Sequence, residues 1–269
     1  MIWNAKNGEV TFGNTRMNYV SFGRGKRTLI LLPGLSDGLA TVKGKALLLA
    51  KPYTPFFDRY TVYIFSRKVD LPSGYSIRDM ANDQADVMNA LGINKACIMG
   101  VSQGGMIAQY LAIDHPEMVE KLILAVTAPA ANDIIKAAVM KWINYAEQRK
   151  HKELMIDTAE KSYSPTYLKK YRKLYPVIGV VGKPLNYNRF LVNANAILGF
   201  DAFSELKKIT CPTFIIGGEI DQIVGIQASY DMKSQIVGSE LHAYAGLGHA
   251  AYEEAKDFNQ RVFDFLETE

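Results

Sequence analysis

The sequence predicts an α/β fold built on a mostly parallel β-sheet. Apolar runs alternate with stretches of helical periodicity along much of the chain, and this alternation is typical of βαβ units. Several runs are apolar throughout, as expected for strands covered by helices on both faces: residues 29–32, 97–99 and 214–216. The chain has 269 residues, a length at which α/β folds often form one domain. We therefore expect one domain around a single sheet, with at most one inserted segment.

The first elements are predicted to be short strands. β-rich runs cover residues 9–12, 17–22 and 28–32. Gly23 to Lys26 separate the second run from the third, and their length and composition are typical of a hairpin loop. We therefore expect the chain to open with antiparallel strands.

Strand and helix signals then alternate. Predicted strands and helices follow one another in this order: strand 61–65, helix 76–91, strand 96–101, helix 103–113 and strand 121–126. Ser76, followed three residues later by Asp79, has the pattern of a capping box, and Gly92 is a helix stop signal. Further strands are expected at residues 214–218 and 241–244.

A helical segment rich in tyrosine interrupts the alternation between the strand ending near residue 126 and the one starting near residue 212. Connections in α/β folds are usually far shorter. We predict that residues 129–205 form a helical lid, inserted into a core made of residues 1–128 and 206–269. Ordinary crossover helices are the alternative. The lid tyrosines also favour an apolar or aromatic acyl pocket: Tyr145, Tyr163, Tyr167, Tyr171, Tyr175 and Tyr187.

Composition argues against several classes of protein. Hydrophobic residues make up 48% and charged residues 22%, close to the average for globular proteins. The formal net charge is only +4 and shows no clustered basic footprint, so no nucleic-acid partner is expected. The densest cationic run is interpreted as a solvated helix face: Lys169, Lys170, Arg172 and Lys173.

The N-terminus and the hydropathy pattern predict a soluble, cytoplasmic protein. Residues 1–10 contain no apolar run of signal-peptide length. No window approaches the roughly 18 apolar residues of a membrane span. Oligomeric state is left open by the sequence.

No metal site and no cofactor are predicted. The two cysteines, Cys97 and Cys211, each open an apolar run that is interpreted as a buried strand, which makes a disulfide scaffold improbable. The four histidines show no metal-ligand spacing with them.

The strongest chemical signal is a G-x-S-x-G motif from Gly100 to Gly104. It follows an apolar strand and precedes a helix, so Ser102 would stand on a sharp turn where a base can reach it. A Cβ at Gly100 or Gly104 would collide with the neighbouring strand or helix. The helix N-terminus below the turn favours developing negative charge. Ser102 is therefore the predicted nucleophile.

With this motif, the chain resembles the α/β-hydrolase superfamily, in particular its lidded esterase, lactonase and C–C hydrolase branch. The resemblance covers nearly the whole chain and is weakest in the lid. It implies an eight-stranded, mostly parallel sheet with helices on both faces. Besides Gly100 to Gly105, it rests on residues 32–34, 75–77, 79–81, 218–221 and 248–249.

In that family an acid follows a late strand and a histidine follows the last one. Asp221 and His249 occupy these positions. The resemblance implies that His249 takes the Ser102 proton and returns it to the leaving group, while Asp221 fixes the tautomer of the imidazole. Asp133 is the one rival acid.

The other histidines are weaker candidates for the base. His115 precedes Pro116 at a helix end and is interpreted as a C-terminal cap. His151 falls in the predicted lid, and His242 falls inside a predicted strand.

The resemblance assigns the oxyanion hole to the backbone N–H groups of Leu35 and Gln103, and one such donor lowers the barrier by roughly 3 kcal/mol. The family usually has His-Gly where this chain has Pro33-Gly34. The fold it implies also places Cys97 and Cys211 on strands that flank a third one, about 9 to 10 Å apart. A disulfide is therefore not expected.

Together these residues predict a serine hydrolase that cleaves a small carboxylic ester or related acyl compound through an acyl-Ser102 intermediate, most simply a carboxylesterase. Ser at this position argues against dehalogenase and epoxide hydrolase activity, because the resemblance implies an Asp nucleophile for those enzymes on the same fold. C–C bond, lactone, thioester and N-terminal peptide hydrolysis are alternatives. A catalytically silent ligand-binding protein is another.

Overall fold

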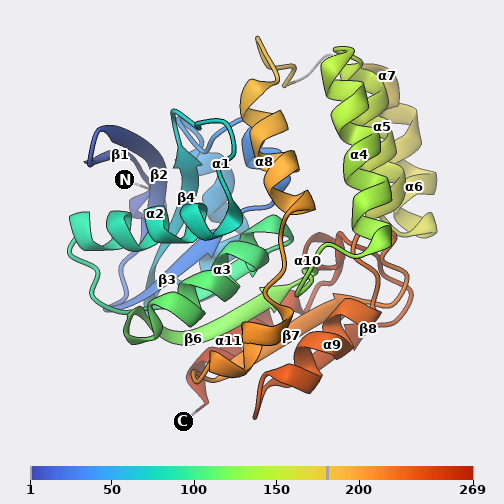
Figure 1. Ribbon diagram of the computed structural model, residues 1–269. Helices are drawn as coiled ribbons and strands as arrows, with labels where there is room; N and C mark the ends of the chain where they lie inside the picture. Colours follow the sequence, from blue (N-terminus) through green and yellow to red (C-terminus); the bar gives the residue numbers. More distant parts are fainter. Residues whose placement is uncertain (1, 180–181, 269) are drawn as a thin grey trace.

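An eight-stranded sheet forms the centre of the computed structural model, which describes residues 2–179 and 182–268 (Figure 1). The strand order is β1-β2-β4-β3-β5-β6-β7-β8. Every pair from β4 to β8 is parallel, and only β1 and β2 run antiparallel to their neighbours. The predicted fold class is confirmed. The strands are β1 (Lys6–Phe12), β2 (Thr15–Gly23), β3 (Arg27–Leu32), β4 (Tyr60–Lys68), β5 (Ala96–Val101), β6 (Val119–Ala125), β7 (Thr213–Gly218) and β8 (Glu240–Tyr244).

Helices connect most of the strands and cover both faces of the sheet (Figure 1). The α-helices are α1 (Ala46–Ala50), α2 (Ile77–Ala90), α3 (Gln103–Asp114), α4 (Asp133–Glu147), α5 (His151–Ser162), α6 (Pro165–Tyr171), α7 (Tyr175–Ile178), α8 (Asn188–Leu198), α9 (Gln227–Gln235), α10 (Ala251–Glu254) and α11 (Phe258–Glu267). The short 3₁₀ helices are η1 (Ile2–Asn4), η2 (Leu35–Gly38), η3 (Lys51–Phe56), η4 (Pro116–Met118), η5 (Arg172–Leu174) and η6 (Phe203–Lys208). No helix among the described residues is long and apolar enough to cross a membrane.

The prediction of a hairpin across Gly23 to Lys26 was wrong, because β2 and β3 do not pair with each other. β4 lies between β2 and β3, antiparallel to the first and parallel to the second. The connecting loop bonds to the residues just before β4: the N–H of Arg24 donates to the carbonyl of Phe57 at 2.9 Å. Gly25 packs so closely on Arg59 that a Cβ there would overlap its backbone. These long-range contacts hold β2 and β3 apart.

The apolar strands alternate between two cores, one on each face of the sheet. In β3, Ile30 and Leu32 join the core under α2 and α3, whereas Leu29 and Leu31 join the one under α1 and α11. This alternation follows from the two-residue period of side chains along a strand. All four side chains are buried, as the sequence predicts for strands covered on both faces.

The predicted capping box of α2 is present. The Ser76 hydroxyl accepts from the N–H of Asp79 at 3.1 Å, and the Asp79 carboxylate accepts from the N–H of Ser76 at 2.9 Å. Gly92 follows the helix with φ +69°, a conformation that glycine adopts without steric penalty.

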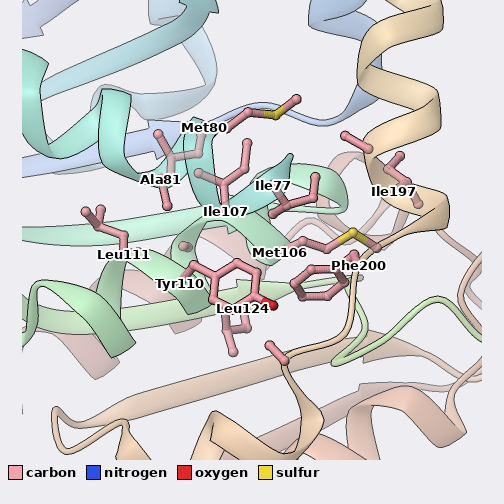
Figure 2. Packing of buried hydrophobic residues seen from close by; sticks show 14 of the residues in the cluster. Ile77, Met80, Ala81, Met106, Ile107, Tyr110, Leu111, Leu124, Ile197 and Phe200 are labelled. Carbon is pink, nitrogen blue, oxygen red and sulfur yellow. The ribbon is translucent and has the colours of Figure 1, made fainter. Parts of the chain in front are cut away.

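Helix α8 packs against the main core rather than standing free of it. Figure 2 shows Ile197 and Phe200 pointing toward α3. The rings of Phe200 and Tyr110 meet edge to face, with their centroids 5.4 Å apart. In Figure 1, α8 stands between the sheet and the group formed by α4, α5, α6 and α7.

The two glycines of the G-x-S-x-G motif are packed as the sequence predicts. A Cβ on Gly100 would lie 2.5 Å from the Cα of Gly105, and one on Gly104 would overlap the carbonyl oxygen of Leu32. Helix α3 therefore starts in direct backbone contact with the end of β3.

We expect Gly104→Ala to destabilise the protein, because the overlapping atom is backbone and the spacing between β3 and α3 must widen. Overpacking of this kind costs about 1–3 kcal/mol or more. Gly199→Ala is the matched control, since the nearest atom to its Cβ is 4.0 Å away. Denaturant unfolding of both variants checks the prediction, and equal free energies of unfolding would contradict it.

Candidate active site

Ser102 lies on a strained turn between β5 and α3. Its φ is 54° and its ψ −121°, a conformation that non-glycine residues rarely adopt. The turn is held by backbone bonds: the Ser102 N–H donates to Ala125 at 2.9 Å, and its carbonyl accepts from Gly105 at 2.8 Å. The Thr127 hydroxyl donates to the same carbonyl at 2.7 Å. The surroundings therefore fix the Ser102 side chain above the start of the helix.

The structure brings Ser102, His249 and Asp221 into one hydrogen-bonded line. The Ser102 Oγ lies 2.9 Å from Nε2 of His249, and Nδ1 of His249 lies 2.8 Å from Oδ2 of Asp221. His249 and Asp221 come from the loops after β8 and β7, whose carboxyl ends are neighbours in the sheet. With Asp221 ionised, Nδ1 carries the proton and Nε2 accepts from the Ser102 hydroxyl.

The surroundings of Asp221 favour the ionised form of its carboxyl group. Its side chain is 1% exposed, and this burial by itself raises the pKa of the carboxyl. The facing His249 and the N–H groups of Ile223 and Val224 outweigh burial and leave the pKa below its ordinary value. Those N–H groups donate to Oδ1 at 2.7 and 3.0 Å. Asp221 is therefore an anion at neutral pH that holds the His249 ring in place.

The two predicted oxyanion donors begin helices beside Ser102. Leu35 is the first residue of η2, and Gln103 is the first residue of α3. The first N–H groups of a helix have no acceptor within that helix. Gly34 places η2 next to Ser102, because a Cβ there would lie 3.3 Å from the Cβ of Ser102. Both N–H groups are thus available on elements that border Ser102.

The rival acid, Asp133, is not part of this arrangement. It lies exposed in the first turn of α4, next to the cap residue Asn132, whereas the carboxylate that contacts His249 belongs to Asp221. Asn132 donates through its side-chain amide to the carbonyl of Val224 at 2.8 Å. The first turn of α4 therefore packs on the loop that holds Asp221 without supplying the acid.

The other histidines lie in structural positions. His115 is the C-cap of α3, as predicted, and its Nε2 lies 3.0 Å from Oδ1 of Asn82. His151 starts α5 and is buried against the ring of Tyr187. His242 lies in β8, where burial lowers the pKa of its imidazole.

Among the described residues, the cysteines and acids are not grouped as metal ligands. Cys97 and Cys211 are free thiols, and burial raises the pKa of Cys97 to about 12. Within residues 2–179 and 182–268, no group of three or more His, Cys, Asp or Glu side chains is placed to hold a metal ion.

A cavity of about 220 Å³ opens beside the turn that carries Ser102. Gly34 and Val101 border it on the side of the nucleophile, and Pro33, which replaces the family's usual His, also lines it. Most of the remaining lining is apolar or aromatic, including Leu31, Val42, Leu49, Ile64, Tyr53 and Tyr252.

A buried charged cluster behind the site was missed by the sequence reasoning. Asp37 and Arg67 are 2% and 1% exposed and contact the elements that carry Leu35 and Gln103. The one available signal was the pair of charged residues, Arg67 and Lys68, at the end of an otherwise mostly apolar strand, β4. No local motif relates Arg67 to Asp37 or Gln103.

We expect Asp221→Asn to lower kcat by about 10⁴-fold, because an amide no longer fixes the His249 tautomer that accepts from Ser102. Asp133→Asn is the matched control and should retain full activity. Steady-state kinetics of both variants provide the measurement. A larger loss in the Asp133 variant would reassign the acid.

Known proteins resemble this chain over most of its length. Residues 64–256 match the family model described as alpha/beta hydrolase fold. A 2-hydroxy-6-oxononadienedioate/2-hydroxy-6-oxononatrienedioate hydrolase from Pseudomonas sp is 31% identical over 201 residues, covering 70% of each chain. A putative carbamate hydrolase, RutD, from Caulobacter vibrioides is 26% identical over 267 residues, covering 90% of this chain and 91% of its own.

Solved structures agree with this match at the level of the fold. The enol-lactonase from Burkholderia xenovorans LB400 superposes with a TM-score of 0.80 at 20% identity, over 97% of this chain and 100% of its own. The family model spans more than half of the chain and includes the turn that carries Ser102. The protein therefore belongs to the α/β-hydrolase family.

Proposed function

We propose that this protein is a serine hydrolase that cleaves a small carboxylic ester or related acyl compound through an acyl-Ser102 intermediate. The observation that carries the proposal is the unbroken line of hydrogen bonds from Ser102 through His249 to Asp221. A serine hydroxyl is a weak nucleophile by itself, and an adjacent base oriented by a third group is what activates it.

In the first half of the proposed reaction, Oγ of Ser102 attacks the carbonyl carbon while Nε2 of His249 takes the hydroxyl proton. The carbonyl oxygen becomes an oxyanion, which the N–H groups of Leu35 and Gln103 stabilise. The intermediate then collapses, and the bond between the acyl carbon and the alcohol oxygen breaks. His249 gives its proton to the departing alkoxide, which leaves as the alcohol.

The second half repeats these steps with water. Nε2 of His249 takes a proton from a water molecule, whose oxygen attacks the acyl carbon. The second tetrahedral intermediate collapses by breaking the bond to Oγ, and His249 returns the proton to Ser102. The products are a carboxylic acid and the free enzyme. Asp221 stays ionised throughout and stabilises the imidazolium.

The cavity beside Ser102 supports a small acyl group. A dry cavity of ~150 Å³ accepts a molecule of benzene. The volume here is about 220 Å³, which is enough for an acyl group that contains one six-membered ring or a short alkyl chain. Its mainly apolar and aromatic lining favours a hydrocarbon substituent.

We also propose that residues 129–205 act as a cap on a core made of residues 1–128 and 206–269. Contacts between the end of α5 and residues 250–253, which follow His249, support a cap that lies next to the site. The Ala250 N–H donates to the carbonyl of Ser162 at 2.8 Å, and the Tyr163 hydroxyl donates to Glu253 at 2.6 Å. The cap thereby touches the loop that carries the proposed base.

A chain-length series of p-nitrophenyl esters tests the proposed activity. We expect turnover of short acyl chains, from acetate to hexanoate, with a steep fall for dodecanoate, which exceeds the cavity. Ser102→Ala should lose the activity by at least about 10³-fold, because the remaining groups supply no nucleophile.

A fluorophosphonate probe distinguishes a protein that does not accept the assay substrates from a protein that has no reactive serine. The wild type should be labelled at Ser102, and the Ser102→Ala variant should not. Absence of both turnover and labelling would contradict the proposal and favour a ligand-binding protein without catalysis.

Hydrolysis of a C–C bond is the second candidate, favoured by the 31% identity to the Pseudomonas hydrolase that is named for a 2-hydroxy-6-oxo dienedioate. The same wild type and Ser102→Ala pair would be mixed with that compound, and the absorbance of its conjugated chromophore followed. Faster turnover of this compound than of any ester would make C–C cleavage the main activity. No turnover would leave the ester assignment standing.

A further inference from the structure

Arg67 is a buried cation that contacts both elements of the proposed oxyanion hole. It lies near the end of β4 and is 1% exposed. Its guanidinium donates to the side-chain oxygen of Gln103 at 2.9 Å, and its backbone N–H donates to the carboxylate of Asp37 at 3.0 Å. Gln103 starts α3, whereas Asp37 lies in η2, two residues after Leu35. One residue therefore connects the two backbone donors.

Asp37 in turn binds helix α8. The Arg189 guanidinium donates to the Asp37 carboxylate at 2.6 Å and, through Nε, to the Asp37 carbonyl at 3.2 Å. It also donates to the carbonyl of Arg67 at 3.0 Å and to that of Lys68. The Arg189 side chain is 18% exposed and that of Asp37 is 1% exposed, so this ion pair is shielded from water. Arg189 thus ties α8 to η2 and to the end of β4.

A second set of bonds joins α8 to α3. The Gln103 side-chain amide donates to the carbonyl of Asn193 at 2.8 Å, and the Asn193 amide donates to the carbonyl of Arg189 at 2.8 Å. Close packing adds to these bonds, because a Cβ on Gly38 would lie only 2.9 Å from the Cα of Phe190. The contacts form a closed circuit from η2 through β4 and α3 to α8.

The charges in this circuit leave an excess of one positive charge. The Arg189 guanidinium pairs with the Asp37 carboxylate, whereas the Arg67 guanidinium donates to the neutral side chain of Gln103. Burial lowers the pKa of Arg67 to about 10, although Asp37 opposes that effect, so the guanidinium is still charged at neutral pH. A fixed positive charge next to Gln103 favours an oxyanion at the neighbouring N–H groups. Removing the Arg189 guanidinium would leave the buried Asp37 carboxylate without its ion pair, which is strongly destabilising.

We propose that Asp37, Arg67, Arg189 and Asn193 form a buried clamp that fixes the N–H groups of Leu35 and Gln103 relative to each other and to α8. Its catalytic consequence rests on the proposed function. Arg67, Arg189 and Asn193 do not line the cavity beside Ser102 and are positioning residues, whereas Asp37 also lines that cavity. α8 is then held fixed against the core, at its other end by Ile197 and Phe200 (Figure 2).

Kinetics of Arg67→Met test the catalytic consequence. A misplacement of about 1 Å can cost 10²-fold, so we expect kcat to fall about 10- to 100-fold, with KM changing less than about 3-fold. The affinity for a boronic acid that forms a tetrahedral adduct on Ser102 should fall by the same factor as kcat/KM. A variant that is merely less stable would not show this proportionality.

Arg27→Met is the matched control. Arg27 starts β3 and forms ion pairs with Glu120 and Glu267 at 2.9 Å each. It lies at the opposite end of the strand from the turn before η2. The control should keep its kcat and its boronic acid affinity within about 2-fold of the wild type. Arg189→Gln, whose side chain is partly exposed, replaces Arg67→Met if that variant does not fold.

Hydrogen exchange tests the clamp without any assay of activity. Opening of a local segment exposes its amides to exchange. Arg189→Gln removes the guanidinium bonds between α8 and Asp37 and should speed exchange at least about 10-fold in both Leu35–Gly38 and Asn188–Leu198, and Arg27→Met should leave both unchanged. Faster exchange in only one segment, or in neither, would overturn the clamp. Absence of both turnover and fluorophosphonate labelling in the wild type would overturn the proposed function. The exchange measurement would still test the clamp, because it does not depend on activity.

Discussion

The close contact between the start of α3 and the end of β3 is the constraint on which the rest of the site depends. Gly104 lies against the carbonyl of Leu32, a distance that no side chain larger than hydrogen allows. Because the helix begins so near the strand, the chain has to turn sharply at Ser102, which adopts φ 54°. The same contact places the first N–H of α3 beside the loop that carries Leu35. The proposed nucleophile and the proposed oxyanion donors are thus products of one packing arrangement.

The parallel sheet explains how distant residues reach this turn. β5, β6, β7 and β8 are consecutive neighbours in the sheet, so the loops that follow them open at one edge. Ser102 follows β5, Asp221 follows β7 and His249 follows β8. The order along the chain and the order across the sheet coincide, and side-chain lengths suffice to close the remaining gaps. Many loop sequences can be placed on such an edge without altering the core.

Electrostatics divides the site into two sides. On one side, the anionic Asp221 faces His249 and favours the positive charge that the proposed reaction places on the imidazole. On the other, Arg67 and Arg189 exceed the charge of Asp37 and favour negative charge at the proposed oxyanion hole. The proposed proton transfer from Ser102 to His249 separates charge in this same direction. Fixed charges of this kind are most effective where little water competes with them.

The sequence by itself determined the α/β class, the buried strands and the elbow at Ser102, because each depends on side chains a few positions apart: an apolar run, a glycine spacing, a capping box. Asp221 and His249 followed only through the resemblance to a family in which strand order is known. Tertiary structure alone decided that β4 separates β2 from β3, against the local signal of a hairpin at Gly23 to Lys26.

Tertiary structure also decided that Arg67 faces Gln103, 36 residues away, and that Asp37 faces Arg189, 152 residues away. Contacts at such separations leave no period or spacing in the sequence, because the intervening chain can take any path that closes the core. Only the packed fold brings these charges together.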